Sequence, residues 1–276
     1  MSESTEAGNL FKAGHLDEAI AAANAAVRKS PADLSARVLL AELLLFAGNL
    51  DRADLVLDAA ADLTPDAAIV IAEFRQLLRG EQARRQLSRD GRLPEMLAEP
   101  TPAISATLAA YVALRSGDPA AAAQSLEAAE ATRPPVSGDH DETAFDDLRD
   151  ADDLCAGFFE VLTTTGKYYW IPTERVESVL FHPPVRPRDL FWRRATMSVR
   201  GGPDGDVYLP ALYVSDAPDL AESLRLGRET DWRQEGNGPT RGLGQRMFLV
   251  GEEACGIMEL GTLTFGGAEA APAGDA

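Results

Sequence analysis

Apolar residues recur with helical spacing through the first half of the chain, which is dominated by alanine and leucine. The clearest apolar stripe consists of four leucines, Leu39, Leu40, Leu43 and Leu44. The pattern predicts helices before Gly14 and over residues 17–29, 34–46, 51–63, 103–115 and 119–131. Asp17 and Asp33 suit N-cap positions, and Pro119 suits the first position of the last helix.

The same short pattern appears three times in this half, and two of its copies lie 34 residues apart. These two copies share six residues, which are Gly14, Leu16, Asp17, Ala19, Ala26 and Pro31, then Gly48, Leu50, Asp51, Ala53, Ala60 and Pro65. The third copy keeps the internal spacing with Gly117, Ala122, Ala129 and Pro134. A 34-residue period with this punctuation is typical of the tetratricopeptide (TPR) helix-turn-helix repeat, whose stacked units form a curved protein-binding surface.

The repeat register does not continue regularly past the second copy. A further period leads to Gln82, where no glycine stands, although residues 68–88 keep a helical pattern. We interpret this stretch as a degenerate unit with a distorted second helix. Pro94, Pro100 and Pro102 then break the pattern before the last helix pair. The array is therefore short and interrupted.

The character of the sequence changes in the second half, where aromatic, glycine, proline and β-branched residues become more frequent. An acid-rich stretch over residues 136–147 is interpreted as a linker, and an acidic helix is expected over 145–163. Strand-like segments follow at 168–171, 195–199, 206–209, 247–250, 255–259 and 262–265, with a short helix at 173–179. Turn residues at 201–205 and 251–254 predict two hairpins.

The predicted fold class is α + (α+β). A TPR-like helical repeat domain is expected over residues 1–135, followed by the acidic linker over 136–147. An α+β domain is expected over residues 148–266, and its sheet should be mostly antiparallel because strands and helices do not alternate regularly. Residues 267–276 are expected to form a disordered tail.

The balance of charge argues against several classes of partner. The chain has 276 residues, with 26 Lys and Arg against 44 Asp and Glu, which gives a net charge of −18. Nucleic acids and anionic membranes both attract clustered basic residues, so neither is an expected partner. The first residues lack the basic and apolar regions of a signal peptide, and no long uncharged apolar stretch follows. We therefore expect a cytoplasmic protein.

Histidine and cysteine, which often serve as nucleophiles or metal ligands, are few in this sequence and lie far apart along it. The histidines and cysteines, His15, His140, His182, Cys155 and Cys255, show no metal-ligand spacing. A nucleophilic pair of Cys255 and His182 is disfavoured because Cys255 lies in an apolar strand pattern, which favours a buried and inert thiol. No nucleophile elbow and no Walker loop is present. We predict a protein that is not an enzyme and binds no cofactor and no metal.

Two segments of the second half offer an alternative binding surface. Residues 186–194 hold four arginines that suit a clamp for an anion or a peptide, and residues 236–244 are rich in glycine. In so acidic a chain, however, the arginines are expected to pair with carboxylates and to cover apolar surface with their stems. The glycine-rich residues 236–244 are more simply explained as a surface loop. The tryptophans are more simply explained as residues of the core or of a domain interface. The residues of this alternative surface are Arg186, Arg188, Trp192, Asp231, Trp232 and Arg241.

The repeat region offers the stronger argument for binding, because the first helix of each pair lines the concave face of such an array. Positions on that face mix apolar anchors with polar groups, as a peptide groove does. They are Val38, Glu42, Leu45, Phe46, Thr107, Tyr111, Leu114 and Arg115. The alternative is that the large apolar side chains among them pack between helices. An exposed strand edge of the C-terminal sheet is a second candidate for capturing a peptide.

Five phrases of the second half, in this order, resemble those of one family. They are Tyr168-Tyr169-Trp170-Ile171-Pro172, Pro183-Pro184-Val185-Arg186-Pro187-Arg188-Asp189-Leu190 with Trp192, Leu209-Pro210-Ala211-Leu212-Tyr213, Thr230-Asp231-Trp232 and Arg241-Gly242-Leu243-Gly244-Gln245-Arg246. With the helical front half, they make the chain similar to the ImpE family, also called TagJ or SciE-type proteins. Members of that family are accessory proteins of bacterial type VI secretion systems.

The resemblance implies a cytoplasmic protein without enzymatic activity. It implies binding to the N-terminal segment of the small subunit of the contractile sheath (TssB-like), and an association with the AAA+ ATPase that recycles contracted sheath (ClpV-like). The expected function is therefore an adaptor that binds the sheath subunit and aids its disassembly. Two alternatives stay open. One is a small enzyme or nucleotide binder that uses Arg186, Arg188, Asp231 and residues 236–244, and the other is a general TPR scaffold for another protein.

Overall fold

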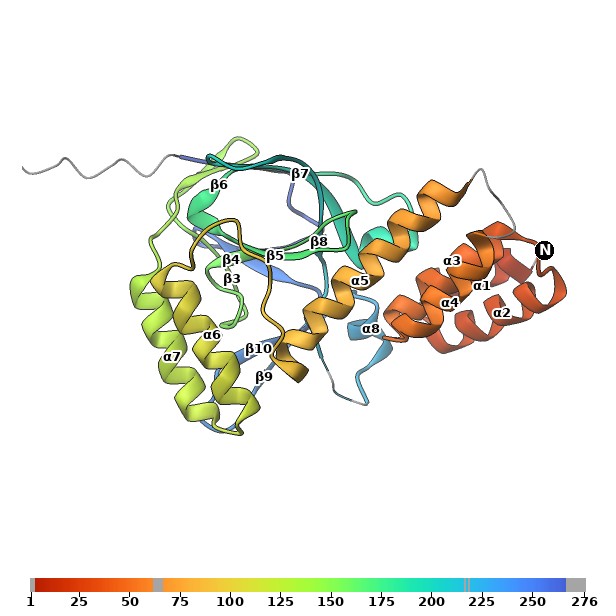
Figure 1. The fold of residues 1–276 in the computed structure, drawn as a ribbon, viewed down its shortest axis with the longest axis horizontal. Coiled ribbons are helices and arrows are strands. Elements are labelled where there is room, and N and C mark those ends of the chain that lie inside the picture. Colours follow the sequence, from red (N-terminus) through yellow and green to blue (C-terminus); the bar gives the residue numbers. More distant parts are fainter. Residues whose placement is uncertain (1–2, 62–66, 216, 218, 267–276) are drawn as a thin grey trace, which may run out of the picture.

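The computed structural model describes residues 3–61, 67–215, 217 and 219–266. Figure 1 shows a helical part at one end, a strongly curved sheet, and a long helix that runs between them. The helices that precede the first strand in the described residues are α1 (Glu3–Ala13), α2 (Leu16–Lys29), α3 (Leu34–Phe46), α4 (Leu50–Ala61), α5 (Ala68–Asp90), α6 (Pro102–Arg115) and α7 (Pro119–Thr132). Pro65 of the repeat pattern and the expected tail over 267–276 lie outside the described residues.

The predicted helix pairs of the repeat copies are confirmed as α1–α2, α3–α4 and α6–α7. The recurring glycines, Gly14, Gly48 and Gly117, turn the chain between paired helices with φ values of 99°, 72° and 75°, a backbone region that favours glycine. Asp33 caps α3 by accepting the amide of Ala36. The expectation for Asp17 is wrong: α2 begins at Leu16, which places Asp17 in the first turn, where its charge complements the helix dipole.

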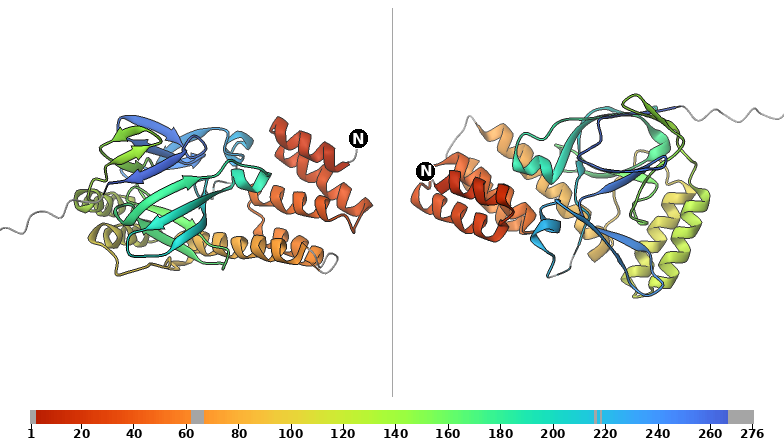
Figure 2. Two further views of the ribbon diagram at one scale, coloured as in Figure 1. Left: turned by 90° about the horizontal axis from the view of Figure 1, so that it is seen from above. Right: turned by 180° about the vertical axis from the view of Figure 1, so that it is seen from behind.

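Helix α5 is unbroken where the sequence predicts a distorted second helix. It runs through Gln82 and ends only at Gly91, which has a φ of 75°. Because no glycine stands at the expected turn, the chain continues as one helix of 23 residues. Its buried face, which includes Phe74, Leu77 and Arg84, packs against the sheet. As Figures 1 and 2 show, α5 thereby carries the α6–α7 pair to the far side of the sheet from α1–α4.

The second half folds into antiparallel sheets, as predicted. Eight strands form the largest sheet, in the order β2-β1-β13-β6-β7-β8-β4-β5, and the others form sheets β12-β11-β3 and β10-β9. The strands are β1 (Gly138–His140), β2 (Thr143–Phe145), β3 (Leu148–Asp150), β4 (Phe158–Leu162), β5 (Tyr168–Pro172), β6 (Val176–Phe181), β7 (Trp192–Val199), β8 (Asp204–Pro210), β9 (Thr230–Gln234), β10 (Thr240–Gly244), β11 (Met247–Val250), β12 (Glu253–Gly256) and β13 (Thr262–Phe265). Three short helical turns, η2 (Thr173–Arg175), η3 (Pro187–Leu190) and α8 (Glu222–Arg225), connect them.

Both predicted hairpins form, as β7–β8 and β11–β12. The helix expected over 145–163 is wrong, because this stretch contains β3 and β4. All five residues of β4 are buried, so apolar side chains face both sides of the strand and imitate a helical stripe. Residues 173–179 form η2 and the start of β6 in place of a helix. The expected linker over 136–147 contains β1 and β2, which pair with each other and, through β1, with β13.

One hydrophobic core extends through both the helices and the sheet. It joins residues of α1–α7 to buried residues of β4, β5, β7 and β8. Phe46 of α3 packs edge-on against Phe191 at 5.3 Å between ring centroids, and Phe74 of α5 packs edge-on against Trp192 at 6.0 Å. The domain boundaries inferred from sequence stay a prediction, since this core runs across them. Within the described residues, no helix is both long enough and apolar enough to cross a membrane.

Candidate functional site

The concave-face residues predicted on α3 are largely covered by the chain itself. Glu42, Leu45 and Phe46 are buried, and Val38 is half-buried against the core. The covering element is η3 with the adjoining Phe191, which packs against α3. Packing within the chain, the alternative considered for the apolar residues, is thus what the structure shows on this helix. A role of these residues in partner binding stays a prediction.

The residues predicted on α6 divide into a buried and an accessible set. Thr107 is buried and donates its hydroxyl to the carbonyl of Ala103. Tyr111 is buried with its ring 5.7 Å from that of Trp170. Leu114 is half-buried and Arg115 is exposed. Only the C-terminal end of α6 therefore presents predicted residues to solvent.

The structure does not bring together the two groups of the alternative surface. Arg188 is buried within η3, with its guanidinium carbon 4.7 Å from the centre of the Phe74 ring, while Arg186 is exposed just before η3. Asp231, Trp232 and Arg241 belong to the β9–β10 hairpin, a pairing that the sequence did not predict. The hollows that border residues 236–244 are lined by neither Arg186 nor Arg188. A composite polar pocket of the kind that the enzyme alternative requires is not formed by these residues.

Within the part of the chain that the structure describes, no hydrogen bond joins Cys255 to His182, the pair of the nucleophile hypothesis. His182 pairs its Nε2 with the hydroxyl of Thr196 at 2.9 Å. Both cysteines are free thiols, Cys155 buried and Cys255 half-buried. Burial is the largest cause that raises the pKa of each thiol, and a raised pKa keeps the sulfur protonated and weakly nucleophilic.

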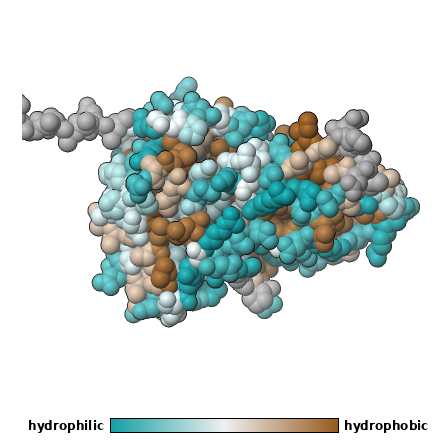
Figure 3. Space-filling model, viewed as in Figure 1, coloured by the Kyte–Doolittle hydropathy of each residue, from teal (hydrophilic) through white to brown (hydrophobic). Residues whose placement is uncertain are grey.

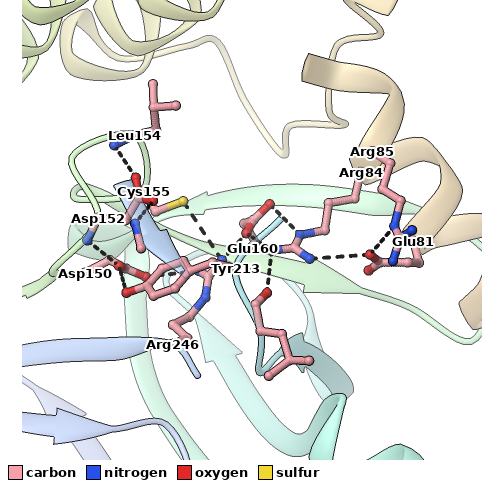
Figure 4. Close-up of polar contacts among 12 residues, drawn as sticks. Glu81, Arg84, Arg85, Asp150, Asp152, Leu154, Cys155, Glu160, Tyr213 and Arg246 are labelled. Carbon is pink, nitrogen blue, oxygen red and sulfur yellow. Dashed lines mark hydrogen bonds and ion pairs between the residues drawn. The ribbon is translucent and has the colours of Figure 1, made fainter. Parts of the chain in front are cut away.

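A buried polar network joins α5 to the sheet, as Figure 4 shows. At its centre, the Glu160 carboxylate of β4 accepts hydrogen bonds from Arg84 at 2.9 and 3.0 Å and also pairs with Arg246. Arg246 pairs in turn with Asp150 at 3.1 Å. On the helix side, Glu81 pairs with Arg84 and accepts the indole N–H of Trp192 at 3.2 Å. We refer to Glu81, Arg84, Asp150, Glu160 and Arg246 as the buried network.

The network is electrostatically complementary despite its burial. Burial alone would raise the pKa of Glu160, but the charges of Arg84 and Arg246 outweigh it and lower that pKa to about 2. For Asp150 the balance is opposite, and burial raises its pKa to about 6 against the charge of Arg246. Tyr213 donates its hydroxyl to Asp150 at 2.8 Å. The arginines and carboxylates of the network pair with one another across α5 and the strands, so the network serves to fix α5 on the sheet.

Most of the phrases that resemble the ImpE family supply residues in or around this network. Tyr168 donates its hydroxyl to Glu160, and Trp170 donates to the Tyr168 hydroxyl at 2.6 Å. Arg241 pairs with Asp152 at 3.2 Å, and Arg246 ends the last phrase. These residues therefore position the helical part on the sheet. A partner-binding surface is expected to lie beside them.

Glu42 lacks a hydrogen-bond partner for its Oε1 atom although it is buried. Burial raises its pKa to about 7, opposed by Arg188 and Arg186 and assisted by Asp189. Since the folded pKa exceeds the unfolded value, wild-type stability falls as the pH rises from about 4.5 to about 7.

Glu42→Gln should remove this dependence. Relative to the variant, the wild type is expected to lose about 3 kcal/mol of unfolding free energy between pH 4.5 and 8. Urea unfolding at both pH values measures the difference, with the exposed Glu18→Gln as control. Parallel pH profiles for the wild type and Glu42→Gln would refute the assignment.

An open cavity of about 540 Å³ lies beside the buried network. It is bordered by the start of α2, the α3–α4 turn, the C-terminal half of α5 and the segments 212–215 and 224–225. We call this cavity the junction groove. Its wall is fastened to the first repeat by Arg228, which donates to the carbonyls of Phe11 and Lys12, and by Glu222, which accepts the amide of Asp17 at 2.9 Å.

Two smaller hollows continue from the junction groove along the β9–β10 hairpin. The first, of about 190 Å³, shares Val214 and Ser215 with the groove. The second, of about 350 Å³, shares Gly238 and Pro239 with the first. Sequence-predicted residues line all three hollows, with Phe46 in the groove, Leu114 and Arg241 in the first hollow and Thr107 in the second.

The edges of the large sheet offer less room for strand addition. The outer edge of β5 is occupied by residue Glu95, whose amide donates to Tyr168 and whose carbonyl accepts from Trp170. The opposite edge strand, β2, has only three residues. The junction groove, which the sequence did not predict, is therefore a better candidate docking surface than a sheet edge.

Comparison with known proteins agrees with this architecture. Residues 142–264 match the model of the ImpE protein family, and residues 10–74 match a tetratricopeptide repeat model. The chain is 29% identical to the type VI secretion system accessory component TagJ of Pseudomonas aeruginosa, over 94% of this chain and 90% of that protein. The crystal structure of protein VPA1032 from Vibrio parahaemolyticus superposes with a TM-score of 0.88 at 27% identity and covers 94% of this chain and 97% of that one. Over residues 142–264 the chain is thus similar to the ImpE family, and tetratricopeptide-type repeats precede this region.

Proposed function

We propose that this protein is a non-enzymatic adaptor of a type VI secretion system that binds the N-terminal segment of the sheath small subunit (TssB-like). The observation that carries the proposal is the similarity to TagJ, a type VI secretion accessory component, over 94% of this chain. An association with the AAA+ ATPase (ClpV-like) that disassembles contracted sheath belongs to the same proposal.

Features of the fold support an adaptor. The repeats, α5 and the sheet share one core, which gives a rigid frame of the kind that holds a peptide with little loss of its own entropy. The junction groove opens on this frame, and two hollows extend it along the β9–β10 hairpin, so a segment longer than a small molecule has room to lie there.

Direct binding tests the proposal. A peptide of the sheath small subunit's N-terminal segment, titrated with the full chain in a calorimeter, is expected to bind with a Kd of about 10 μM or tighter. A scrambled peptide of the same composition is the control. If the native peptide shows no heat of binding at tens of micromolar protein, or binds no better than the scrambled one, the sheath-adaptor function is wrong.

A further inference from the structure

We propose that the junction groove accepts an acidic protein segment, in which carboxylates flank an apolar anchor residue. The identity of the natural partner rests on the proposed function, but the chemistry of the ligand follows from the residues that line the groove. Three features of the groove support this ligand: the charge of its lining, the apolar side chains beside that charge and the continuation of the groove along the β9–β10 hairpin.

The groove concentrates positive charge in a strongly acidic chain. Four arginines line it, Arg84, Arg85, Arg89 and Arg225, against two carboxylates, Asp17 and Glu81, whereas the whole chain carries a net charge of −18. Arg84 is buried and paired with Glu160, so Arg85, Arg89 and Arg225 supply the accessible positive charge. The face in Figure 3 shows hydrophilic side chains along α5, the helix that contributes three of these arginines. A local reversal of sign selects ligands of the opposite charge from the chain as a whole.

The arginines are held in place by contacts within the chain. Arg85 bonds to Glu81 at 3.1 Å and to the carbonyl of Gly48 at 3.2 Å. Arg225 pairs with Asp17 at 3.3 Å, and their side chains are 24% and 73% exposed. Because a guanidinium has five N–H donors, Arg85 and Arg225 keep donors for a ligand carboxylate. The groove is thus preorganised for carboxylates.

Apolar side chains contribute to the lining of the groove beside the arginines. Phe46, Phe191, Leu212 and Leu224 line it, and Phe46 and Phe191 are fixed against each other at 5.3 Å. An apolar side chain between two carboxylates would therefore find a firm contact surface. The groove also leads into the hollow that shares Val214 and Ser215, which suits a chain segment better than a compact anion.

The test uses two labelled probe peptides and the full chain. The first probe carries glutamates around a central leucine, and the second has lysines in place of the glutamates. Fluorescence anisotropy is expected to show that the acidic probe binds at least about tenfold more tightly and that rising salt weakens it, as exposed charge pairs require. Equal affinity for both probes would overturn the proposal.

Charge reversal on the wall of the groove locates the site. The double variant Arg89→Glu with Arg225→Glu should weaken binding of the acidic probe by about tenfold or more. Arg79→Glu is the matched control, because Arg79 is exposed on the same helix but does not line the groove. Its affinity should stay within about twofold of the wild type. Circular dichroism establishes whether each variant is folded. If the charge-reversal double variant is not folded, the neutral double variant Arg89→Gln with Arg225→Gln takes its place.

The same variants separate this inference from the proposed function. If the sheath segment and the acidic probe each bind the wild type and the double variant equally, the inference fails, while the adaptor function stands. If only the acidic probe binds, and the double variant abolishes that binding, the groove is confirmed and the sheath partner is wrong. If neither peptide binds the wild type, both proposals fail.

Discussion

Replacing Trp192 by alanine is expected to lower the free energy of unfolding by about 4 kcal/mol. The side chain is 1% exposed and packs edge-on against Phe74 of α5 and against Phe191. Truncation removes these contacts, leaves a large cavity between helix and sheet, and deprives buried Glu81 of the indole N–H. The three losses act at one place, where the helical part meets the sheet.

Trp232→Ala provides the matched control in a denaturant titration. Trp232 is 39% exposed on the β9–β10 hairpin, so its removal should cost less than about 1 kcal/mol. The unfolding curve of Trp192→Ala should stay a single transition at lower denaturant, because the two parts share a core. Similar losses for both tryptophans would contradict the assigned role of Trp192.

Glu160→Gln is expected to destabilise the protein by about 3 to 5 kcal/mol. The substitution keeps the shape of the side chain but removes the charge that Arg84 and Arg246 share. Both arginines are almost completely buried, so neither can recover its lost partner by turning to water. Arg84 would retain Glu81, and Arg246 would retain Asp150, which limits the loss.

The pH dependence of this variant gives an independent readout. The pKa of Glu160 is lowered to about 2 from an ordinary value of 4.5, so its contribution is present above pH 4.5 and is lost as the pH falls toward 2. Wild type and Glu160→Gln should therefore converge in stability under acid, whereas Glu252→Gln, at an exposed turn, should follow the wild type throughout. A constant difference down to pH 2 would refute the linkage to this carboxylate.

The repeat region was predictable because its signals are local. Gly14, Gly48 and Gly117 each mark a turn that only the residues beside it determine, and caps such as Asp33 act within one helical turn. The same local rule explains the error at β4, where Phe158 and Leu162 stand at helical spacing although the strand is buried on both faces. Periodicity alone cannot separate those two cases.

The buried network and the junction groove were not predictable, because both depend on contacts between distant parts of the chain. Glu160 meets Arg84 across 76 residues and Arg246 across 86. The wall of the groove depends on Arg228 reaching Phe11 across 217 residues. Sequence did select Phe46, Leu114 and Arg241, which line the groove and its neighbouring hollow, from the repeat pattern and the family phrases. The sequence pattern did not show that η3 covers much of α3.

Hydrogen–deuterium exchange of the full chain, with and without the sheath segment, tests the central claim most directly. An adaptor that uses the junction groove should show slower exchange on binding at residues 46–48, 84–89 and 212–215, which line the groove. Residues of the large sheet's outer strands β2 and β5 should exchange unchanged. Protection confined to those strands, or no protection at saturating peptide, would contradict the account.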